Sequence, residues 1–255
     1  MQAVRSNLNL SGMRLPSLRA SPRSARASMS MWEKPIYRLM SKRGKPIFID
    51  VTTSVSPGLP PNKAIRGLIK FFRNRNINKI VDFGAGALRH TFPLLNAGFQ
   101  VCAVEFEENF LRPICKEALT KATDHPNFSR LIYPRDFIRD RRRFDAALLC
   151  YVFQVMPLKH EREKVLKHLS EKLADDAYLL YMSRYNQTEG ALPEHRVEDG
   201  YYKWPEREHH SFYREFTTEE THETMERFHF KRVKSFSQRG NDQIFLYAKG
   251  TATWI

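Results

Sequence analysis

Short apolar segments alternate with segments of helical periodicity through the middle of the chain. The pattern predicts strands over residues 79–83, 99–105, 130–133, 144–151 and 177–182, and helices over residues 63–75, 89–97, 109–122 and 158–173. The segment 144–151 is apolar on both faces, which is typical of a central parallel strand. This alternation predicts a parallel sheet with helices on both faces.

The last part of the chain departs from this alternation. A helix is expected to begin at residues 217–220, where two threonines precede two glutamates. Strands are expected over 230–236 and 243–248, and the short connection between them rules out a parallel pair, which needs a crossover of about a dozen residues. We therefore expect an α/β protein whose mostly parallel seven-stranded sheet ends in a C-terminal antiparallel hairpin.

Two segments precede this domain, which we expect over residues 62–250. Residues 32–61 form an N-terminal extension with a short strand over 47–51 and a proline-rich turn after it. Residues 1–31 form a basic tail, since the first 30 residues contain five arginines, seven serines and no acidic residue. Three interpretations stay open: a disordered arm, a targeting segment, or an overextended reading frame that begins at Met29 or Met31. The expected location is cytoplasmic, or an organelle if the tail is a transit peptide.

Composition narrows the class of protein. The chain has 42 Lys and Arg against 28 Asp and Glu, a net charge of +14, and five of its arginines lie in the tail. Its three cysteines include no Cys-x-x-Cys pair, so neither a disulfide framework nor a zinc site is expected. The longest mostly apolar run, residues 144–157, is shorter than the roughly 18–20 residues of a membrane-spanning helix. We expect no membrane association.

The best chemical motif is a glycine loop after the first of these strands. Ile80-Val81-Asp82-Phe83-Gly84-Ala85-Gly86 leads from a strand into a Gly-x-Gly turn, which lets the backbone approach a ligand closely. Glu105 ends the next strand, where an acidic residue would bind a ribose diol. A dinucleotide site needs a small residue at position 89 beside the pyrophosphate, and Arg89 stands there. The loop therefore favours a ligand with a ribose and an adenine but no pyrophosphate.

At this point the sequence resembles the class I S-adenosylmethionine-dependent methyltransferases, which have a Rossmann-like fold. The resemblance covers roughly residues 62–250. It rests on the motifs Val81–Gly86, Val104-Glu105, Asp136-Phe137 and Phe144–Cys150, together with the terminal hairpin. It implies S-adenosyl-L-methionine as the cofactor and methyl transfer as the activity.

The resemblance also implies which residues bind the cofactor. The amino-acid part would contact Asp82, Gly84, Ala85 and Gly86, and the methionine moiety would border Cys150 and Tyr151. Glu105, followed by Phe106, would accept hydrogen bonds from the ribose hydroxyls, and Asp136, followed by Phe137, would bind the adenine amino group. The alternative is that Asp82 caps a helix and Asp136 caps a turn.

The sequence leaves the methyl acceptor and the catalytic base open. Many relatives carry a His-x-Pro arrangement after the fourth strand, and the matching segment here is Gln154-Val155-Met156-Pro157, without a histidine. The candidates for the reacting centre are Tyr151, Gln154 and Tyr185, and no metal site is expected. The acceptor is expected at an insertion over residues 184–216. Its aromatics could stack on a planar acceptor, or the insertion could be a small subdomain that buries them: Tyr185, Tyr201, Tyr202, Trp204, Phe212 and Tyr213.

Basic clusters bear on the choice of acceptor. Lys70, Arg73 and Arg75 end a helix, and the arginines of residues 139–143 are expected in a loop beside the adenine pocket. Such clusters could neutralise nucleic-acid phosphates or form a solvated surface. A small-molecule acceptor is favoured over RNA or protein. A catalytically silent S-adenosylmethionine- or RNA-binding module is the alternative, and an NAD-dependent enzyme a weaker one. The oligomeric state is not determined by the sequence.

Overall fold

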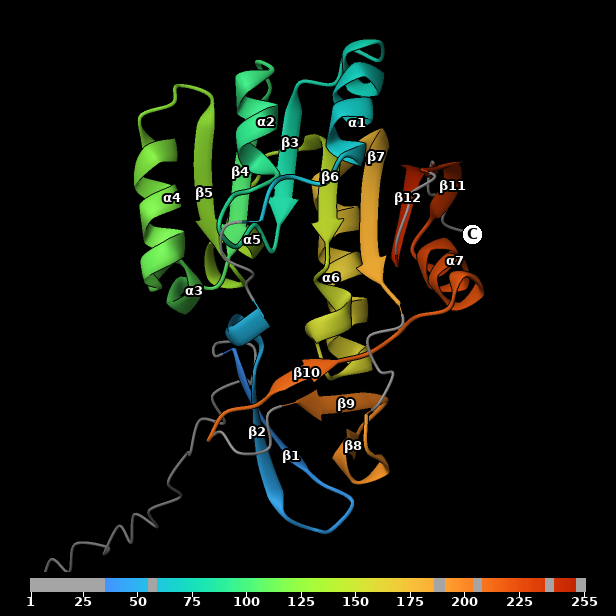
Figure 1. Cartoon of the computed structure of the whole chain (residues 1–255). Helices are drawn as coiled ribbons and strands as arrows, with labels where there is room; N and C mark the ends of the chain where they lie inside the picture. Colours follow the sequence, from blue (N-terminus) through green and yellow to red (C-terminus); the bar gives the residue numbers. More distant parts are fainter. Residues whose placement is uncertain (1–34, 55–58, 186–190, 204–207, 237–240, 251–255) are drawn as a thin grey trace, which may run out of the picture.

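A seven-stranded sheet forms the centre of the computed structural model, which describes residues 35–54, 59–185, 191–203, 208–236 and 241–250 (Figure 1). Its strands are β3 (Lys79–Phe83), β4 (Gln100–Glu105), β5 (Phe128–Ile132), β6 (Phe144–Cys150), β7 (Leu173–Arg184), β11 (Phe230–Ser235) and β12 (Asp242–Lys249). They lie in the order β11-β12-β7-β6-β3-β4-β5. Strands β5, β4, β3, β6 and β7 are mutually parallel, whereas β12 and β11 are antiparallel to their neighbours. This confirms the predicted fold class.

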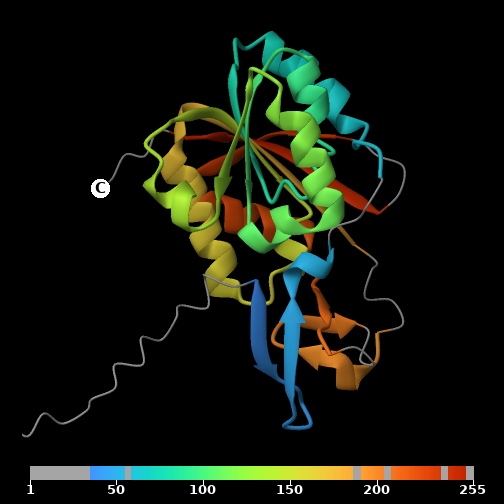
Figure 2. The same cartoon turned by 90° about the vertical axis from the view of Figure 1, so that its left-hand side faces the viewer.

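Helices cover both faces of the sheet (Figure 2). They are α1 (Ala64–Arg73), α2 (Thr91–Asn96), α3 (Glu107–Leu111), α4 (Pro113–Thr123), α5 (Arg135–Arg139), α6 (Lys159–Lys172) and α7 (Thr218–Arg227). Successive residues of β6 point to opposite faces, because side chains alternate along a strand. Ala147 and Leu149 pack in the core with α6 and α7, and Ala146 and Leu148 pack with α1 and α2.

The apolar face of α1 holds this helix against the sheet. Leu68 and Phe72 lie four residues apart on one face and are fully buried against the sheet, which contributes about 1.5–3 kcal/mol for each side chain. At its first turn the Asn62 Oδ1 accepts a hydrogen bond of 2.9 Å from the Ala64 N–H, as predicted for a capping residue.

The helix predicted over residues 109–122 is wrong in one respect. It is two helices, α3 and α4, and Arg112 between them is extended (φ −65°, ψ 140°). Pro113 is the cause, because its ring disfavours the helical conformation of the preceding residue while fitting the first position of a new helix. Strand β7 is also longer than predicted, since it begins directly after α6.

The N-terminal extension and the insertion meet in space although about 160 residues separate them in the sequence. Strands β1 (Ile36–Met40) and β2 (Pro46–Asp50) form a hairpin, and a 3-10 turn follows over Val51–Ser54. The insertion folds into an antiparallel sheet of β8 (Arg196–Val197), β9 (Gly200–Lys203) and β10 (Ser211–Tyr213). We call the hairpin, the 3-10 turn and this small sheet the cap.

Backbone hydrogen bonds and a separate apolar core hold the cap together. The Asp50 N–H donates to the His210 carbonyl at 2.9 Å, and the His210 N–H donates to the Phe48 carbonyl at 2.8 Å. Ile49 and Phe212 are buried in the cap core. Figures 1 and 2 place the cap beyond the carboxyl ends of the parallel strands. The tail 1–31, Trp204 and residues 237–240 of the predicted connection between the last two strands lie outside the described residues.

Candidate functional site

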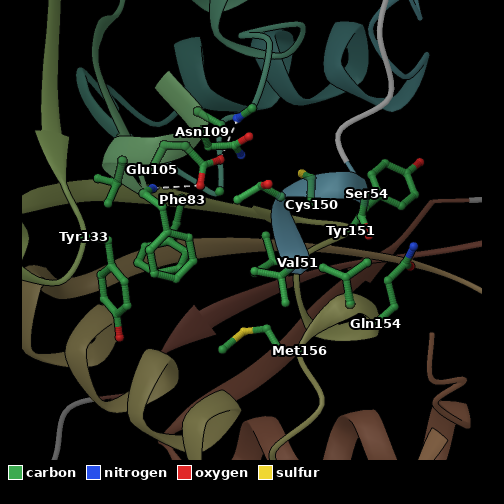
Figure 3. Close-up of a pocket in the computed structure, with 18 of the residues that line it drawn as sticks. Val51, Ser54, Phe83, Glu105, Asn109, Tyr133, Cys150, Tyr151, Gln154 and Met156 are labelled. Atoms are coloured by element: carbon green, nitrogen blue, oxygen red, sulfur yellow. Dashed lines mark hydrogen bonds between the residues drawn. The ribbon is translucent and has the colours of Figure 1, made fainter. Parts of the chain in front are cut away.

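A cavity lies at the carboxyl ends of β3, β4 and β6, beneath the cap (Figure 3). In open α/β sheets this edge is where ligands bind. The glycine loop forms one wall, and two of its residues have left-handed backbones, Gly84 with φ +70° and Gly86 with φ +51°. A side-chain carbon at Gly84 would overlap the Cγ2 atom of Val152. Glycine is therefore required there both for the conformation of the loop and for its packing.

The Glu105 carboxylate supports this loop from the end of β4. It is buried, and it accepts hydrogen bonds from the Gly86 N–H at 2.9 Å and from the Phe106 N–H at 2.8 Å. Burial raises the pKa of Glu105, and the backbone hydrogen bonds oppose the rise. The Asn109 side chain also hydrogen-bonds to Glu105, and because a carboxylate has about four acceptor positions, Glu105 keeps capacity for a ligand hydroxyl.

One end of the cavity is aromatic. The Tyr133 ring packs edge-on against Phe83, with centroids 4.9 Å apart, and against Phe106, with centroids 5.8 Å apart. All three rings line the cavity, and Met156 lines it as well. This end suits a flat, largely apolar group.

The other end is cationic and polar. The guanidinium carbons of Arg89 and Arg184 lie 4.9 Å and 5.2 Å from the centre of the Tyr151 ring. Tyr151 has a left-handed backbone (φ +63°), and its hydroxyl donates a 2.9 Å hydrogen bond to Asp242 Oδ2. Left-handed backbones are uncommon outside glycine and cost free energy, and such strain clusters at functional sites.

His90 lines this cationic end with a neutral ring. Burial, and then the neighbouring Arg89, lower the pKa of His90 to about 3. Its Nε2 atom is buried, and no residue in the described part of the chain hydrogen-bonds to it. Asn109 also lines the cavity, and its Oδ1 is a second buried atom of this kind. Buried polar atoms are almost always paired, so both atoms fit hydrogen bonds to a ligand.

The cap closes the cavity from above. Val51, Thr52 and Ser54 of the 3-10 turn line it, and the Arg112 guanidinium donates a hydrogen bond to the Thr52 carbonyl. Arg112 is available for this contact because Pro113 ends α3 there. The hydrogen bond therefore joins the cap to the helices that flank the cavity.

Eight of the twelve predicted site residues line the cavity: Gly84, Ala85, Gly86, Glu105, Phe106, Cys150, Tyr151 and Gln154. Four do not. Asp82 lies below the loop, and Tyr185 follows β7, where its N–H donates to the Asn241 carbonyl. Asp136 pairs with Arg135 at the surface, and Phe137 is buried in the core against Phe83. The Oε1 atom of Gln154 is already occupied, because it accepts a 2.8 Å hydrogen bond from the Arg184 N–H.

Several lining residues were not predicted. Arg89 was weighed only as an obstacle to a pyrophosphate, and its neighbour His90 carried no recognisable pattern. Arg184 begins the insertion and, among the described residues of the insertion, is the one that lines the cavity. The aromatics of the insertion that the structure describes do not line it, and Phe212 instead packs in the cap core. Val51–Ser54 reaches the cavity only through long-range contacts, which no local motif encodes.

The position predicted for the arginines of residues 139–143 is wrong for Arg142 and Arg143. They lie where the strands begin, at the opposite end of the sheet from the cavity, since Phe144 starts β6. Arg142 pairs with Asp140 and donates to Ser129, and Arg143 donates to the Leu173 carbonyl. These internal contacts do not support a nucleic-acid site near the cavity.

The described residues contain no group of three or more His, Cys, Asp or Glu side chains placed to hold a metal ion. Within the same residues, none of the helices is long and apolar enough to cross a bilayer.

Asp82 is a buried acid with a shifted pKa. Its Oδ2 accepts a 2.6 Å hydrogen bond from the Thr91 hydroxyl, and burial raises its pKa from 3.8 to about 6. The folded protein thus keeps a proton that the unfolded chain releases above about pH 4. The stability contributed by this proton is present below pH 4 and is lost as the pH rises through 6.

Asp82→Asn is expected to remove this pH dependence. Relative to the variant, the free energy of unfolding of the wild type falls by up to about 3 kcal/mol between pH 4 and pH 7, since one pKa unit corresponds to about 1.4 kcal/mol. Urea unfolding of both proteins at four pH values measures it. A difference that stays constant over this range would contradict the assignment.

Known proteins resemble this chain in sequence over part of its length and in fold over most of it. Residues 81–179 match a family model described as a methyltransferase domain. No curated protein shows a significant match. Among solved structures, a SAM-dependent methyltransferase from Methanosarcina mazei is 16% identical with a TM-score of 0.57, and the match covers 76% of this chain and 100% of that one.

Two further structures carry ligands. The 1,6-didemethyltoxoflavin-N1-methyltransferase of Burkholderia thailandensis, with bound 1,6-didemethyltoxoflavin and S-adenosylhomocysteine, is 19% identical with a TM-score of 0.54, and the match covers 79% of this chain and 82% of that one. Magnesium protoporphyrin IX methyltransferase from Synechocystis PCC 6803, with bound SAH, is 14% identical with a TM-score of 0.53. The match covers 74% of this chain and 83% of that one. At these identities the likeness is one of fold.

The sheet topology and the cavity at its carboxyl edge define a Rossmann-like α/β fold with a candidate ligand site. More particularly, residues 81–179 are similar to a methyltransferase domain, and the fold of the chain is similar to that of S-adenosylmethionine-dependent methyltransferases, two of whose structures hold S-adenosylhomocysteine.

Proposed function

We propose that this methyltransferase transfers the methyl group of S-adenosylmethionine to a small-molecule acceptor bound beneath the cap. The observation that carries the proposal is the arrangement along one cavity of an aromatic end, the Glu105 carboxylate beside the glycine loop, and a cationic end. These three regions match the adenine, the ribose and the amino-acid part of S-adenosylmethionine. The unpaired atoms of His90 and Asn109 add polar positions that such a ligand fills.

The ribose and adenine are assigned first. Glu105 accepts hydrogen bonds from the ribose hydroxyls, since it is the buried carboxylate beside Gly86. Phe106 and Tyr133 flank the adenine. This replaces the pair Asp136 and Phe137, because the exposed Arg135 ion pair occupies Asp136 and the Phe137 side chain packs below Phe83.

The amino-acid part is assigned to the glycine loop and the cationic end. Arg89 lines the cavity beside this loop, and its guanidinium suits the ligand carboxylate. His90 stays neutral at physiological pH, so it adds a hydrogen-bonding atom near the sulfonium without a second positive charge.

Methyl transfer depends mainly on positioning and on exclusion of water. S-adenosylmethionine supplies a methyl group activated by the positively charged sulfur. Tyr151 and Gln154 line the place where the acceptor meets that methyl group. Burial, and then the charge of Asp242, raise the pKa of Tyr151, so the hydroxyl keeps its proton and positions groups rather than acting as a base.

The cap favours a small acceptor over a macromolecule. Val51–Ser54 covers the cavity, and the hydrogen bond from Arg112 to Thr52 fastens this cover to the flanking helices. A small molecule fits within such an enclosure, whereas a protein or RNA strand needs an open approach.

Two measurements test the proposal. In calorimetry, S-adenosylmethionine and S-adenosylhomocysteine should bind with one site per chain, and NAD should not bind. Tritiated S-adenosylmethionine should then label the metabolite fraction of a cell extract in preference to its RNA and protein fractions. Labelling of RNA or protein alone would overturn the acceptor class, and binding without any labelling would indicate a silent binding module.

A further inference from the structure

A second cavity borders the first on the far side of the Arg89, Tyr151 and Arg184 side chains, which line both cavities. We call it the outer cavity. Its remaining walls come from residues 59–63, the first turn of α1, the end of β11 with the residue after it, and the start of β12. In Figure 1 these elements lie on the α1 side of the sheet, where β7 and β12 are neighbours. A molecule in the outer cavity is thus separated from the cofactor cavity by one layer of side chains.

Hydrogen bonds hold this dividing layer in place. The Tyr151 hydroxyl accepts a 2.9 Å hydrogen bond from Asn62 Nδ2 and donates one to Asp242 Oδ2. Asp242 also pairs with Arg184, with 3.3 Å between Oδ1 and Nε. Asn62, Arg184 and Asp242, from three separate parts of the chain, therefore hold the Tyr151 ring between the two cavities.

The described walls of the outer cavity are strongly basic. Four cations line it, Lys63, Arg89, Arg184 and Lys234, against the single carboxylate of Asp242. That carboxylate is already engaged by Arg184, Tyr151 and Asn62. Neither lysine forms an ion pair with a carboxylate of the described residues.

The position of Lys63 is unfavourable for stability alone. It stands at the N-terminus of α1, where the helix dipole disfavours a positive charge, and the first turn contains no acidic residue to offset it. An anion beside Lys63 would be attracted both by the ammonium group and by the helix terminus. Lys234 faces the same cavity from β11.

We propose that the outer cavity binds an anionic group of the methyl acceptor, a carboxylate or a phosphate, through Lys63 and Lys234. This inference rests on the proposed function. The body of the acceptor lies beneath the cap, and its anionic group extends beside Tyr151 into the outer cavity. The acceptor nucleophile forms the new bond to the methyl carbon, and the carbon–sulfur bond breaks with its electron pair remaining on sulfur. A proton carried by the nucleophile leaves to solvent.

The test uses the full chain saturated with S-adenosylhomocysteine and three probes of one shape: benzoate, phenyl phosphate and benzamide. Nuclear magnetic resonance titration of the 15N-labelled protein should show saturable shifts around Gly67 and Ser235 with benzoate or phenyl phosphate and none with benzamide. The better anion identifies the carboxylate or the phosphate as the preferred group. Equal binding of benzamide, or shifts confined to another part of the protein, would overturn the proposal.

A pair of variants completes the test. Lys63→Gln combined with Lys234→Gln should weaken binding of the anionic probe at least fivefold, and Lys116→Gln combined with Lys121→Gln on α4 should leave it unchanged. Neither pair lines the cofactor cavity, so both should bind S-adenosylhomocysteine within twofold of the wild type. Unchanged probe binding in the first pair of variants contradicts the proposed anion site in the outer cavity. Failure of S-adenosylhomocysteine to bind the wild type contradicts the proposed function instead.

Discussion

Glu105→Gln is expected to weaken S-adenosylmethionine binding by about 100-fold or more. A hydrogen bond to a charged group contributes about 1.5–3 kcal/mol, and the proposed site places the ribose diol against this carboxylate. A loss of about 2.7 kcal/mol corresponds to 100-fold in affinity. Glutamine keeps the shape of the side chain but only one oxygen acceptor, so either the Gly86 N–H or the Phe106 N–H loses its acceptor, and part of the loss in affinity comes from the loop.

Glu108→Gln is the matched control, because Glu108 is an exposed residue of the neighbouring helix α3. It should bind S-adenosylmethionine with wild-type affinity. Calorimetry measures both affinities, and thermal unfolding shows whether each variant is folded. Wild-type affinity in a folded Glu105→Gln protein would remove Glu105 from the ribose site.

Gly84→Ala is expected to destabilise the protein by about 3 kcal/mol or more and to abolish cofactor binding. Two effects add: the left-handed backbone, which costs a non-glycine residue about 1–2 kcal/mol, and the overlap of the new methyl group with Val152 Cγ2. The change therefore tests packing as well as binding, and a larger residue such as valine at position 84 should lower stability further.

A double-mutant cycle separates the two effects. Val152→Ala removes the overlapping atom, so the double variant should be at least 1 kcal/mol more stable than the sum of the single changes predicts. Gly98→Ala is the control for the backbone alone, because Gly98 has φ +93° and open space around its missing side chain. Urea unfolding supplies the free energies. Additive effects would show that Val152 does not restrict position 84.

The central strands and the loop could be predicted from the sequence because their determinants are local. Strands β3, β4 and β6 lie within one residue of the predicted bounds, since they are apolar on both faces and turn residues bound them. Glu105 followed from its place at the end of the strand after the loop. The break at Arg112 was also encoded locally, by Pro113, but the helical periodicity on either side concealed it.

The part of the cap that covers the cavity could not be predicted from local sequence patterns. Val51–Ser54 reaches the cavity because Asp50 pairs with His210, and no short pattern specifies a partner at such a distance. The role of Arg89 could not be predicted from a local pattern either. Arg89 is a poor residue beside a pyrophosphate but a suitable one beside a carboxylate, and only its position over Tyr151 distinguishes these roles.

The pairing of β2 with the segment before β10 also dictates an order of assembly. The hairpin leaves the ribosome early, yet its Ile49 gains the apolar partners of the insertion, Val197 and Phe212, only about 150 residues later. Contacts that close long loops form late, because the entropy of closing the loop is lost before the contact gives any stability. We therefore expect the glycine loop and Glu105 to fold before the cap does. Hydrogen exchange should show the hairpin amides as less protected than those of β3 and β6, so the enclosure opens without unfolding of the sheet beneath it.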